Sequence, residues 1–171
     1  NSNYLLKNGG PNNNFKFINE ANSSKTSEPK LSFPCWFFDY NQDGWDDLFV
    51  SGFDFQQFES AGGEVAKDYL GIPVDAELPK LYLNNKNGTF TDVTKQTNVD
   101  KVLFTMGSNF GDLNNDGFPD FYAATGTPDY RALIPKRMFL NGNGNQFYDV
   151  TTAGGFGHLQ KGHGVAFGDL D

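Results

Sequence analysis

Residues 39–47 read DYNQDGWDD, and the same pattern returns as DLNNDGFPD at residues 112–120. A third copy opens as DLD at residues 169–171. In both complete copies Asp or Asn stands at positions 1, 3, 5 and 9, and a Gly at position 6 lets the chain turn sharply. A pattern that recurs in this way along one chain indicates a repeat architecture.

A second recurring element follows each acidic copy. It reads LYLNNKNGTFTDVT from Leu81, MFLNGNGNQFYDVT from Met138 and, more loosely, LLKNGGPNNNFKFI from Leu5. The distance from Leu81 to Asp112 is 31 residues, and the distance from Met138 to Asp169 is also 31 residues. The two elements therefore belong to one repeating unit, although the first complete unit is 16 residues longer than the second.

Each unit contains four short segments rich in aromatic or β-branched residues and bounded by Gly, Asn or Asp, the pattern of short strands. In the first complete unit they are Pro34–Phe38, Leu48–Gly52, Lys80–Asn84 and Thr89–Thr94. Four strands per repeat is the content of a propeller blade, whereas a β-helix repeat is much shorter. We therefore expect an all-β fold, a β-propeller with blades of four antiparallel strands, of which this chain covers about three.

The repeats also predict where the units of this single propeller domain begin and end. Residues 1–30 are expected to supply the end of one blade, residues 31–101 and 102–160 a full blade each, and residues 161–171 the start of the next. Because the third copy stops inside its motif, we expect the chain to be part of a longer propeller.

The extra residues of the first complete unit fall at about residues 53–79. Ser60 is a suitable N-cap for a short helix there, Gly71 is a suitable end, and Pro73 prevents continuation. We expect this insertion to decorate the surface of its blade.

The alternate polar residues of the two loops have the spacing of a calcium site. Hard oxygen ligands on alternate residues suit Ca²⁺, which accepts six to eight oxygens, and a cation relieves the repulsion among three nearby carboxylates. The predicted ligands are the side chains of Asp39, Asn41, Asp43 and Asp47 with the Trp45 carbonyl, and those of Asp112, Asn114, Asp116 and Asp120 with the Phe118 carbonyl. Asp169 and Asp171 open a third such loop.

An EF-hand is excluded because its Glu at position 12 is replaced by Val50 in the first loop and by Ala123 in the second. Apolar residues follow position 9 directly, so each loop is expected to join two strands. The alternative, an Asx-rich hairpin turn without metal, stays open.

These loops resemble the FG-GAP or VCBS repeats of integrin-α-like propellers. The stretch from Met106 to Asp171, including MGSNFGDLNNDGFPDFY, GFGHLQKGHG and VAFGDLD, resembles bacterial members of the ASPIC/UnbV group, relatives of cartilage acidic protein. The resemblance covers nearly the whole chain, more loosely before Phe33. It implies a seven-bladed propeller with calcium in its hairpins, and the ligands named above match the family position by position. Asn41 and Asn114 stand where many such loops have Asp, which lowers the charge of each site.

The resemblance also implies an exported protein, extracellular, at the cell surface or associated with a bacterial outer membrane, with a role in adhesion or surface assembly. The formal net charge of −8, with 13 Lys and Arg against 21 Asp and Glu, argues against a nucleic-acid partner. No apolar run approaches the roughly 18 residues of a membrane span, so this segment is not expected to cross one.

Three residues outside the loops are candidates for other chemistry. Cys35 is the only cysteine and is expected to be a core residue. His158 and His163 are the only histidines, and we favour structural hydrogen bonds at a blade junction over a transition-metal or acid–base role, which stays open.

Two functions remain. We favour a binding module for a protein or glycan partner, because the sequence contains no recognisable catalytic constellation and is not expected to be an enzyme. The alternative is a propeller domain of, or associated with, a polysaccharide-active enzyme, with Trp36, Tyr69 and Tyr130 stacking on sugars.

Overall fold

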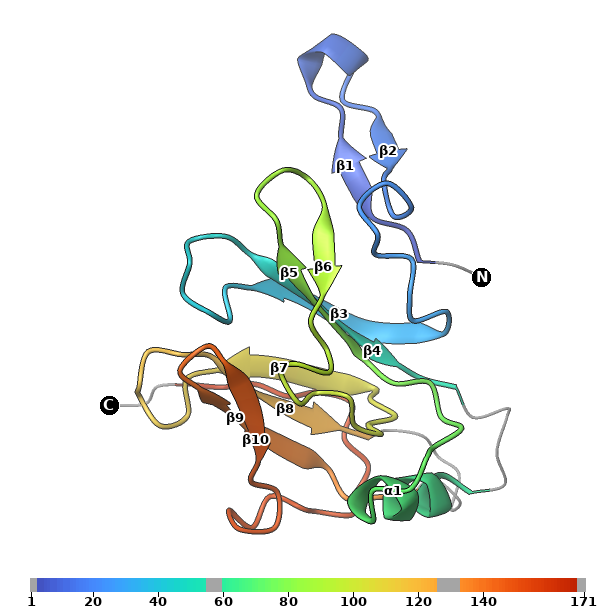
Figure 1. Ribbon diagram of the computed structural model, residues 1–171, viewed down its shortest axis with the longest axis vertical. Helices are drawn as coiled ribbons and strands as arrows, with labels where there is room; N and C mark the ends of the chain where they lie inside the picture. Colours follow the sequence, from blue (N-terminus) through green and yellow to red (C-terminus); the bar gives the residue numbers. More distant parts are fainter. Residues whose placement is uncertain (1–2, 55–59, 126–132, 169–171) are drawn as a thin grey trace.

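The computed structural model describes residues 3–54, 60–125 and 133–168. These residues form two four-stranded antiparallel sheets, a two-stranded hairpin that projects as an arm, and one α-helix (Figure 1). The arm consists of β1 (Leu6–Asn8) and β2 (Phe17–Asn19), joined through the short 3₁₀ helix η1 (Pro11–Asn13).

The first sheet has the order β3-β4-β5-β6 and the second the order β7-β8-β9-β10, so each is a simple up-and-down meander. The strands are β3 (Ser32–Phe38), β4 (Asp47–Gly52), β5 (Lys80–Asn84), β6 (Phe90–Asp92), β7 (Gly107–Gly111), β8 (Asp120–Ala124), β9 (Arg137–Gly142) and β10 (Gln146–Asp149). The prediction of an all-β fold with propeller-like blades of four strands is therefore confirmed. Within the described ranges the sheets do not close into a ring.

The two sheets pair their central strands in the same register. Leu48 lies opposite Tyr82 in the first sheet, as Phe121 lies opposite Phe139 in the second. The last strand is shorter than predicted, because the Thr94 backbone turns away and donates its N–H to Asp92 Oδ1 at 3.0 Å. The repeat of the sequence is thus a repeat of strand pairing.

Aromatic side chains pack between the sheets and form the main core. The Phe121 ring stacks on Phe139 with centroids 4.6 Å apart and lies 5.1 Å from Phe49 of the first sheet. Trp36 stacks on Phe49 at 4.3 Å, so its indole is a packing residue of this core. The faces of two neighbouring blades meet here.

Neighbouring units also meet through repeated contacts. The Phe90 N–H donates to Ser24 O at 3.0 Å, and in the next unit the Phe147 N–H donates to Thr97 O at 2.8 Å. At the inner edge the first strands β3 and β7 are in contact, with the rings of Phe38 and Phe110 5.3 Å apart. The unit boundaries expected from the sequence stay a prediction.

The insertion contains α1 (Ala61–Tyr69), and its predicted signals are confirmed. The Gly63 N–H donates to Ser60 Oγ at 3.2 Å, and Gly71 has a φ of 66° just beyond the helix.

The insertion, which was expected to decorate the surface of a blade, also contacts the second sheet. Asp68 of α1 pairs with Arg137 of β9, and Arg137 also donates to Asp149 Oδ2 from its Nη2 at 2.6 Å. The guanidinium lies 4.6 Å from the centroid of the Tyr69 ring, and Arg137 is 3% exposed. A buried arginine needs carboxylate partners, and α1 supplies one of them across the seam between the two sheets.

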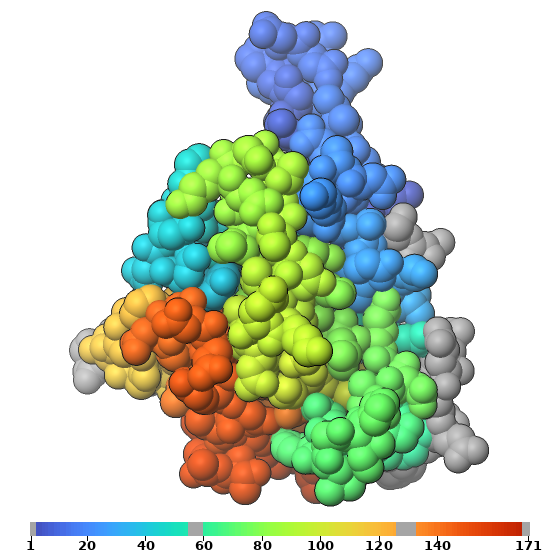
Figure 2. All heavy atoms as spheres, viewed as in Figure 1, coloured from blue at the N-terminus to red at the C-terminus, as the bar shows by residue number. Residues whose placement is uncertain are grey.

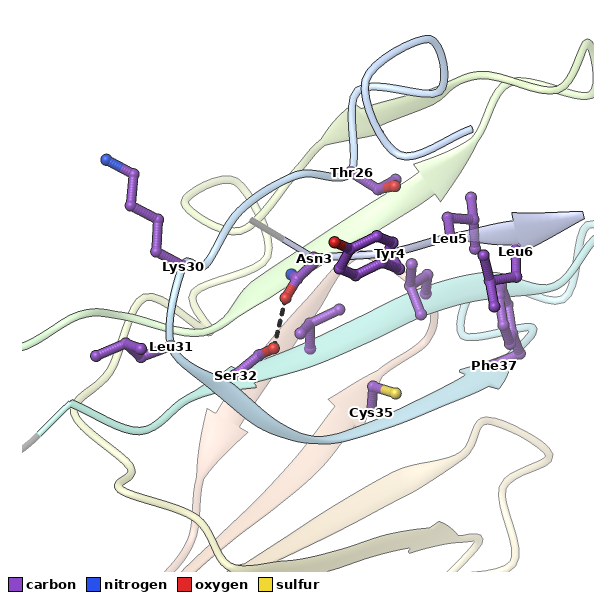
Figure 3. Close-up of a pocket in the computed structure, with 12 residues that line it drawn as sticks. Asn3, Tyr4, Leu5, Leu6, Thr26, Lys30, Leu31, Ser32, Cys35 and Phe37 are labelled. Carbon is purple, nitrogen blue, oxygen red and sulfur yellow. Dashed lines mark hydrogen bonds between the residues drawn. The ribbon is translucent and has the colours of Figure 1, made fainter. Parts of the chain in front are cut away.

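The expectation of a buried Cys35 is also wrong. Along β3 the even-numbered Trp36 and Phe38 face the inter-sheet core, so Cys35 and Phe37 face the opposite side and are exposed. They line a groove of about 670 Å³ between the arm and the first sheet (Figure 3). The arm stands clear of the rest of the molecule above it (Figure 2).

The α-helix α1 has nine residues. Among the described residues, none of the helical structure is long and apolar enough to cross a membrane.

Candidate metal centre

The first acidic loop connects β3 to β4 and folds around the carboxylate of its first residue. Asp39 Oδ1 accepts the Asp43 N–H at 3.0 Å, and Asp39 Oδ2 accepts the Gly44 N–H at 2.7 Å. Gln42 and Gly44 have φ values of 60° and 85°, which place positions 4 and 6 in the left-handed region. These two positions reverse the chain over the carboxylate.

The second loop connects β7 to β8 and has the same local structure. Asp112 Oδ1 accepts the Asp116 N–H at 3.0 Å, and Asp112 Oδ2 accepts the Gly117 N–H at 2.8 Å. Asn115 and Gly117 have φ values of 58° and 90°. Both loops lie at the same edge of the molecule, the first in cyan and the second in gold in Figure 1.

The side chains at positions 3 and 5 also lean over their own loop. In the first loop Asn41 Oδ1 accepts the Asp43 N–H at 3.2 Å, and Asp43 Oδ1 accepts the Trp45 N–H at 3.0 Å. In the second loop the Asp116 N–H lies 3.3 Å from Asn114 Oδ1, and the Phe118 N–H donates to Asp116 Oδ1 at 2.9 Å. Predicted side-chain ligands thus share one turn in each loop.

Position 9 differs from the others because it is buried. Asp47 is 0% exposed, and its Oδ1 accepts the Asn84 N–H at 2.8 Å. Asp47 Oδ2 is also buried but has no hydrogen-bond partner. The pKa of Asp47 is raised to about 6, chiefly by burial; the charges of Asp43 and Asp39 also raise it, and the backbone N–H groups of Asn84 and Tyr40 lower it.

The equivalent Asp120 is fully buried but better paired. Asp120 Oδ1 accepts the Asn141 N–H at 2.7 Å, and Asp120 Oδ2 accepts the Leu113 N–H at 2.8 Å. Burial raises the pKa of Asp120 as well, although these two amides oppose the effect. Burial of a carboxylate oxygen without a hydrogen bond is costly unless a cation faces it. Of the two described loops, the first has this deficit at Asp47 Oδ2, although the Tyr40 N–H lowers the pKa of Asp47.

Asn84 and Asn141, which hold the position-9 carboxylates, were missed as site residues. Both occupy the fourth position of the second recurring element, LYLN and MFLN. The recurrence of Asn at this position was a signal, but the spacing was not, because Asn84 follows Asp47 by 37 residues and Asn141 follows Asp120 by 21. A backbone N–H donor also leaves no trace in residue type.

The two loops are also joined to one another. Asn141 Nδ2 donates to Tyr40 O of the first loop at 2.8 Å, and Gln42 Nε2 donates to Gly117 O of the second. Asn141 therefore holds Asp120 through its backbone and the first loop through its side chain.

The predicted ligands are near one another but not assembled into a cluster of acids. Across the described ranges, no three His, Cys, Asp or Glu side chains are grouped in a way that holds a metal ion. The side chains at positions 1, 3 and 5 instead accept the N–H groups of their own turns. Asp169 and Asp171 of the third loop lie outside the described residues, and calcium binding stays a prediction.

The remaining candidates are only partly clarified. The side chains of His158 and His163 are exposed, and the His158 carbonyl accepts the Lys136 N–H at 3.1 Å. Of the aromatic residues suggested for sugar stacking, Trp36 is in the inter-sheet core and Tyr130 lies outside the described residues. Tyr69 is half-exposed beside Arg137 and borders a cavity of about 370 Å³.

A protein-family model described as an FG-GAP-like repeat matches residues 66–123. The matched segment begins within α1, contains β5, β6, β7 and the second acidic loop, and ends within β8. No match is found among curated proteins. The family match supports the FG-GAP part of the expected relationship and does not extend to the ASPIC/UnbV group.

Proposed function

We propose, from an FG-GAP-like repeat set in propeller-like sheets, that this chain is a calcium-binding module that attaches to a protein or glycan partner outside the cell or at its surface. The FG-GAP-like repeat suggests a binding or adhesion role. Within this proposal the chain is an exported member of the ASPIC/UnbV group, and its blades present loops to the partner in adhesion or surface assembly.

The observation that carries the calcium proposal is the buried carboxylate of Asp47 with its bare Oδ2 atom. The carboxylates of Asp39 and Asp43 lie near enough to raise its pKa. An arrangement of this kind is unfavourable by itself and is stabilised by a divalent cation with oxygen preference.

The chain's own residues have distinct parts in such a site. Asp39, Asn41 and Asp43 supply side-chain oxygens from one side of the first loop, Trp45 a carbonyl, and Asp47 a buried carboxylate fixed by Asn84. Asp112, Asn114, Asp116, Phe118 and Asp120 supply the same set in the second loop. When bound, Ca²⁺ supplies positive charge that balances the negative charges of these carboxylates.

Calcium titration of chelator-treated protein tests this proposal. At a calcium concentration 100 times the Kd, each site stabilises the folded state by about 2.7 kcal/mol, so the Tm should rise with concentration. Calorimetry should show binding that is weakened by Asp39→Asn combined with Asp43→Asn. Asp46→Asn is the matched control, because Asp46 is an exposed acid of the same loop at a position without a ligand role. An unchanged Tm and no heat of binding would contradict the proposal.

The partner and the location require separate tests. Binding of the protein to arrayed glycans and to cell-surface proteins, with calcium and then with chelator, should give signals that depend on calcium. Fractionation of cells that express the full-length protein should place it in the exported or surface fraction, and its recovery from the cytosol would contradict that part.

A further inference from the structure

A lysine lies against the first acidic loop. Lys86 Nζ is 3.1 Å from Asp43 Oδ2, and the two side chains are 46% and 27% exposed. Asp43 is at position 5 of the loop, and its other oxygen accepts the Trp45 N–H. In Figure 2 the β5–β6 hairpin, in light green, lies beside the cyan surface of this loop.

The position of Lys86 is fixed by the same residue that fixes Asp47. Asn84 Oδ1 accepts the Lys86 N–H at 2.9 Å, while the Asn84 N–H donates to Asp47 Oδ1 at 2.8 Å. Lys86 has a φ of 63°, as the hairpin turn requires. The ammonium group is therefore presented to the loop by the hairpin that anchors the buried carboxylate.

Among the described residues, no cation is paired with an acid of the second loop. The residue at the position of Lys86 in the second recurring element is Asn143, which has a similar φ of 55°. Asp116 Oδ2 instead accepts Asn114 Nδ2 at 2.9 Å, a neutral contact between two residues of the loop itself. The two loops thus have the same predicted ligands and differ in one facing charge.

We propose that Lys86 is a built-in counter-ion of the first loop, which neutralises Asp43 when calcium is absent and has to be displaced when calcium binds. This inference rests on the proposed calcium binding. Its consequence is that the first loop binds calcium more weakly than the second. Calcium must break the Lys86–Asp43 contact and bind beside a positive charge, whereas in the second loop an amide only rotates.

The effect is modest because the ion pair is partly exposed. Loss of such a pair changes an equilibrium constant by up to about fivefold, and removal of the charge repulsion adds to it, so a change of roughly three- to tenfold in Kd is expected.

Reciprocal variants provide the test. Lys86→Asn gives the first loop the residue of the second, and Asn143→Lys does the reverse. Lys86→Arg keeps the charge, and Lys95→Asn removes one from an exposed residue that lies outside both loops. Terbium luminescence excited through tryptophan reports the first loop, because position 7 is Trp45 there and Phe118 in the second. Trp45→Phe should remove the signal, and competition with calcium then gives the Kd.

Lys86→Asn should tighten calcium binding at the first loop three- to tenfold and leave the second loop unchanged, as calorimetry of both sites would show. Asn143→Lys should weaken the second loop, and Lys86→Arg should behave like the unaltered protein. In chelator, Lys86→Asn should lower the Tm, since Asp43 loses its counter-ion.

A first-loop Kd for Lys86→Asn equal to that of Lys95→Asn would overturn the inference and leave calcium binding intact. Absence of calcium binding in every variant would overturn both.

Discussion

Replacing Asp47 by Asn is expected to stabilise the protein in chelator and to lose that advantage in calcium. In chelator the ionised carboxylate is buried with Oδ2 unpartnered. A rise in its pKa from 3.8 to about 6 corresponds to about 3 kcal/mol of destabilisation at neutral pH. The new amide keeps the bond from Asn84, but its NH₂ group has no acceptor, which costs about 1–2 kcal/mol. The net gain is about 1–2 kcal/mol.

Calcium is expected to change this order. The unaltered protein gains about 2.7 kcal/mol per site at 100 times its Kd, while a variant that binds a hundredfold more weakly gains only about 0.4 kcal/mol. Urea unfolding of both proteins in chelator and in calcium measures the difference. The gain in chelator should also shrink as the pH falls from about 6 towards 3.8, because the raised pKa makes folded Asp47 take up a proton before the unfolded chain does.

Asp120→Asn is the matched control, at the same position of the second loop. Both Asp120 oxygens accept N–H groups, so the new NH₂ group would face the N–H of Leu113 or Asn141. We expect a loss of about 1 kcal/mol in chelator, after relief of the buried charge is taken into account. If Asp47→Asn lowers the free energy of unfolding in chelator as much as Asp120→Asn does, the unpartnered Oδ2 of Asp47 does not destabilise the protein and the reasoning is refuted.

Three further predictions concern the framework around the loops. Arg137→Met should cost about 3–5 kcal/mol in urea unfolding, because two carboxylates lose their buried partner, and Asp68→Asn in the same protein should restore part of it; additive losses would contradict a shared network. Glu64 is buried, which raises its pKa, but Lys67 and two backbone N–H groups outweigh this and lower it. Glu64→Gln should therefore lose about 1–3 kcal/mol at neutral pH, and the difference should shrink as the pH falls below 4.5; a constant difference in an acid titration would argue against it. Phe121→Ala should cost about 3–5 kcal/mol, against roughly 0.5 kcal/mol for the exposed Tyr148→Ala, and equal costs would exclude the inter-sheet core.

The sequence predicted what depends on repetition. The recurring elements that begin at Leu81 and Met138 pair with the preceding strand in the same register in both sheets, and the Gly at position 6 of each loop has the positive φ that the turn needs. These features follow from residue type and from recurrence along the chain, so they can be predicted from the sequence.

Features that depend on tertiary packing were not predicted. Cys35 was expected in the core because its neighbours are apolar, but the alternation of β3 turns it to the opposite face. Arg137 gave no sign of its partner on α1, since 69 residues separate it from Asp68. Asp47 and Asp120 are identical in their loops, but the Leu113 N–H donates to Asp120 Oδ2, whereas the equivalent Tyr40 N–H lowers the pKa of Asp47 without a hydrogen bond to its Oδ2.

The connection from β4 to β5 is longer than its counterpart in the second unit, yet the strands on either side pair identically. The length of this connection therefore does not affect the pairing of the strands that it joins. A new recognition element can be spliced in here, or an existing one exchanged, while the rest of the blade keeps its form. The α1 segment shows how such an addition contributes to the adjacent sheet, because its Asp68 carboxylate pairs with the buried Arg137.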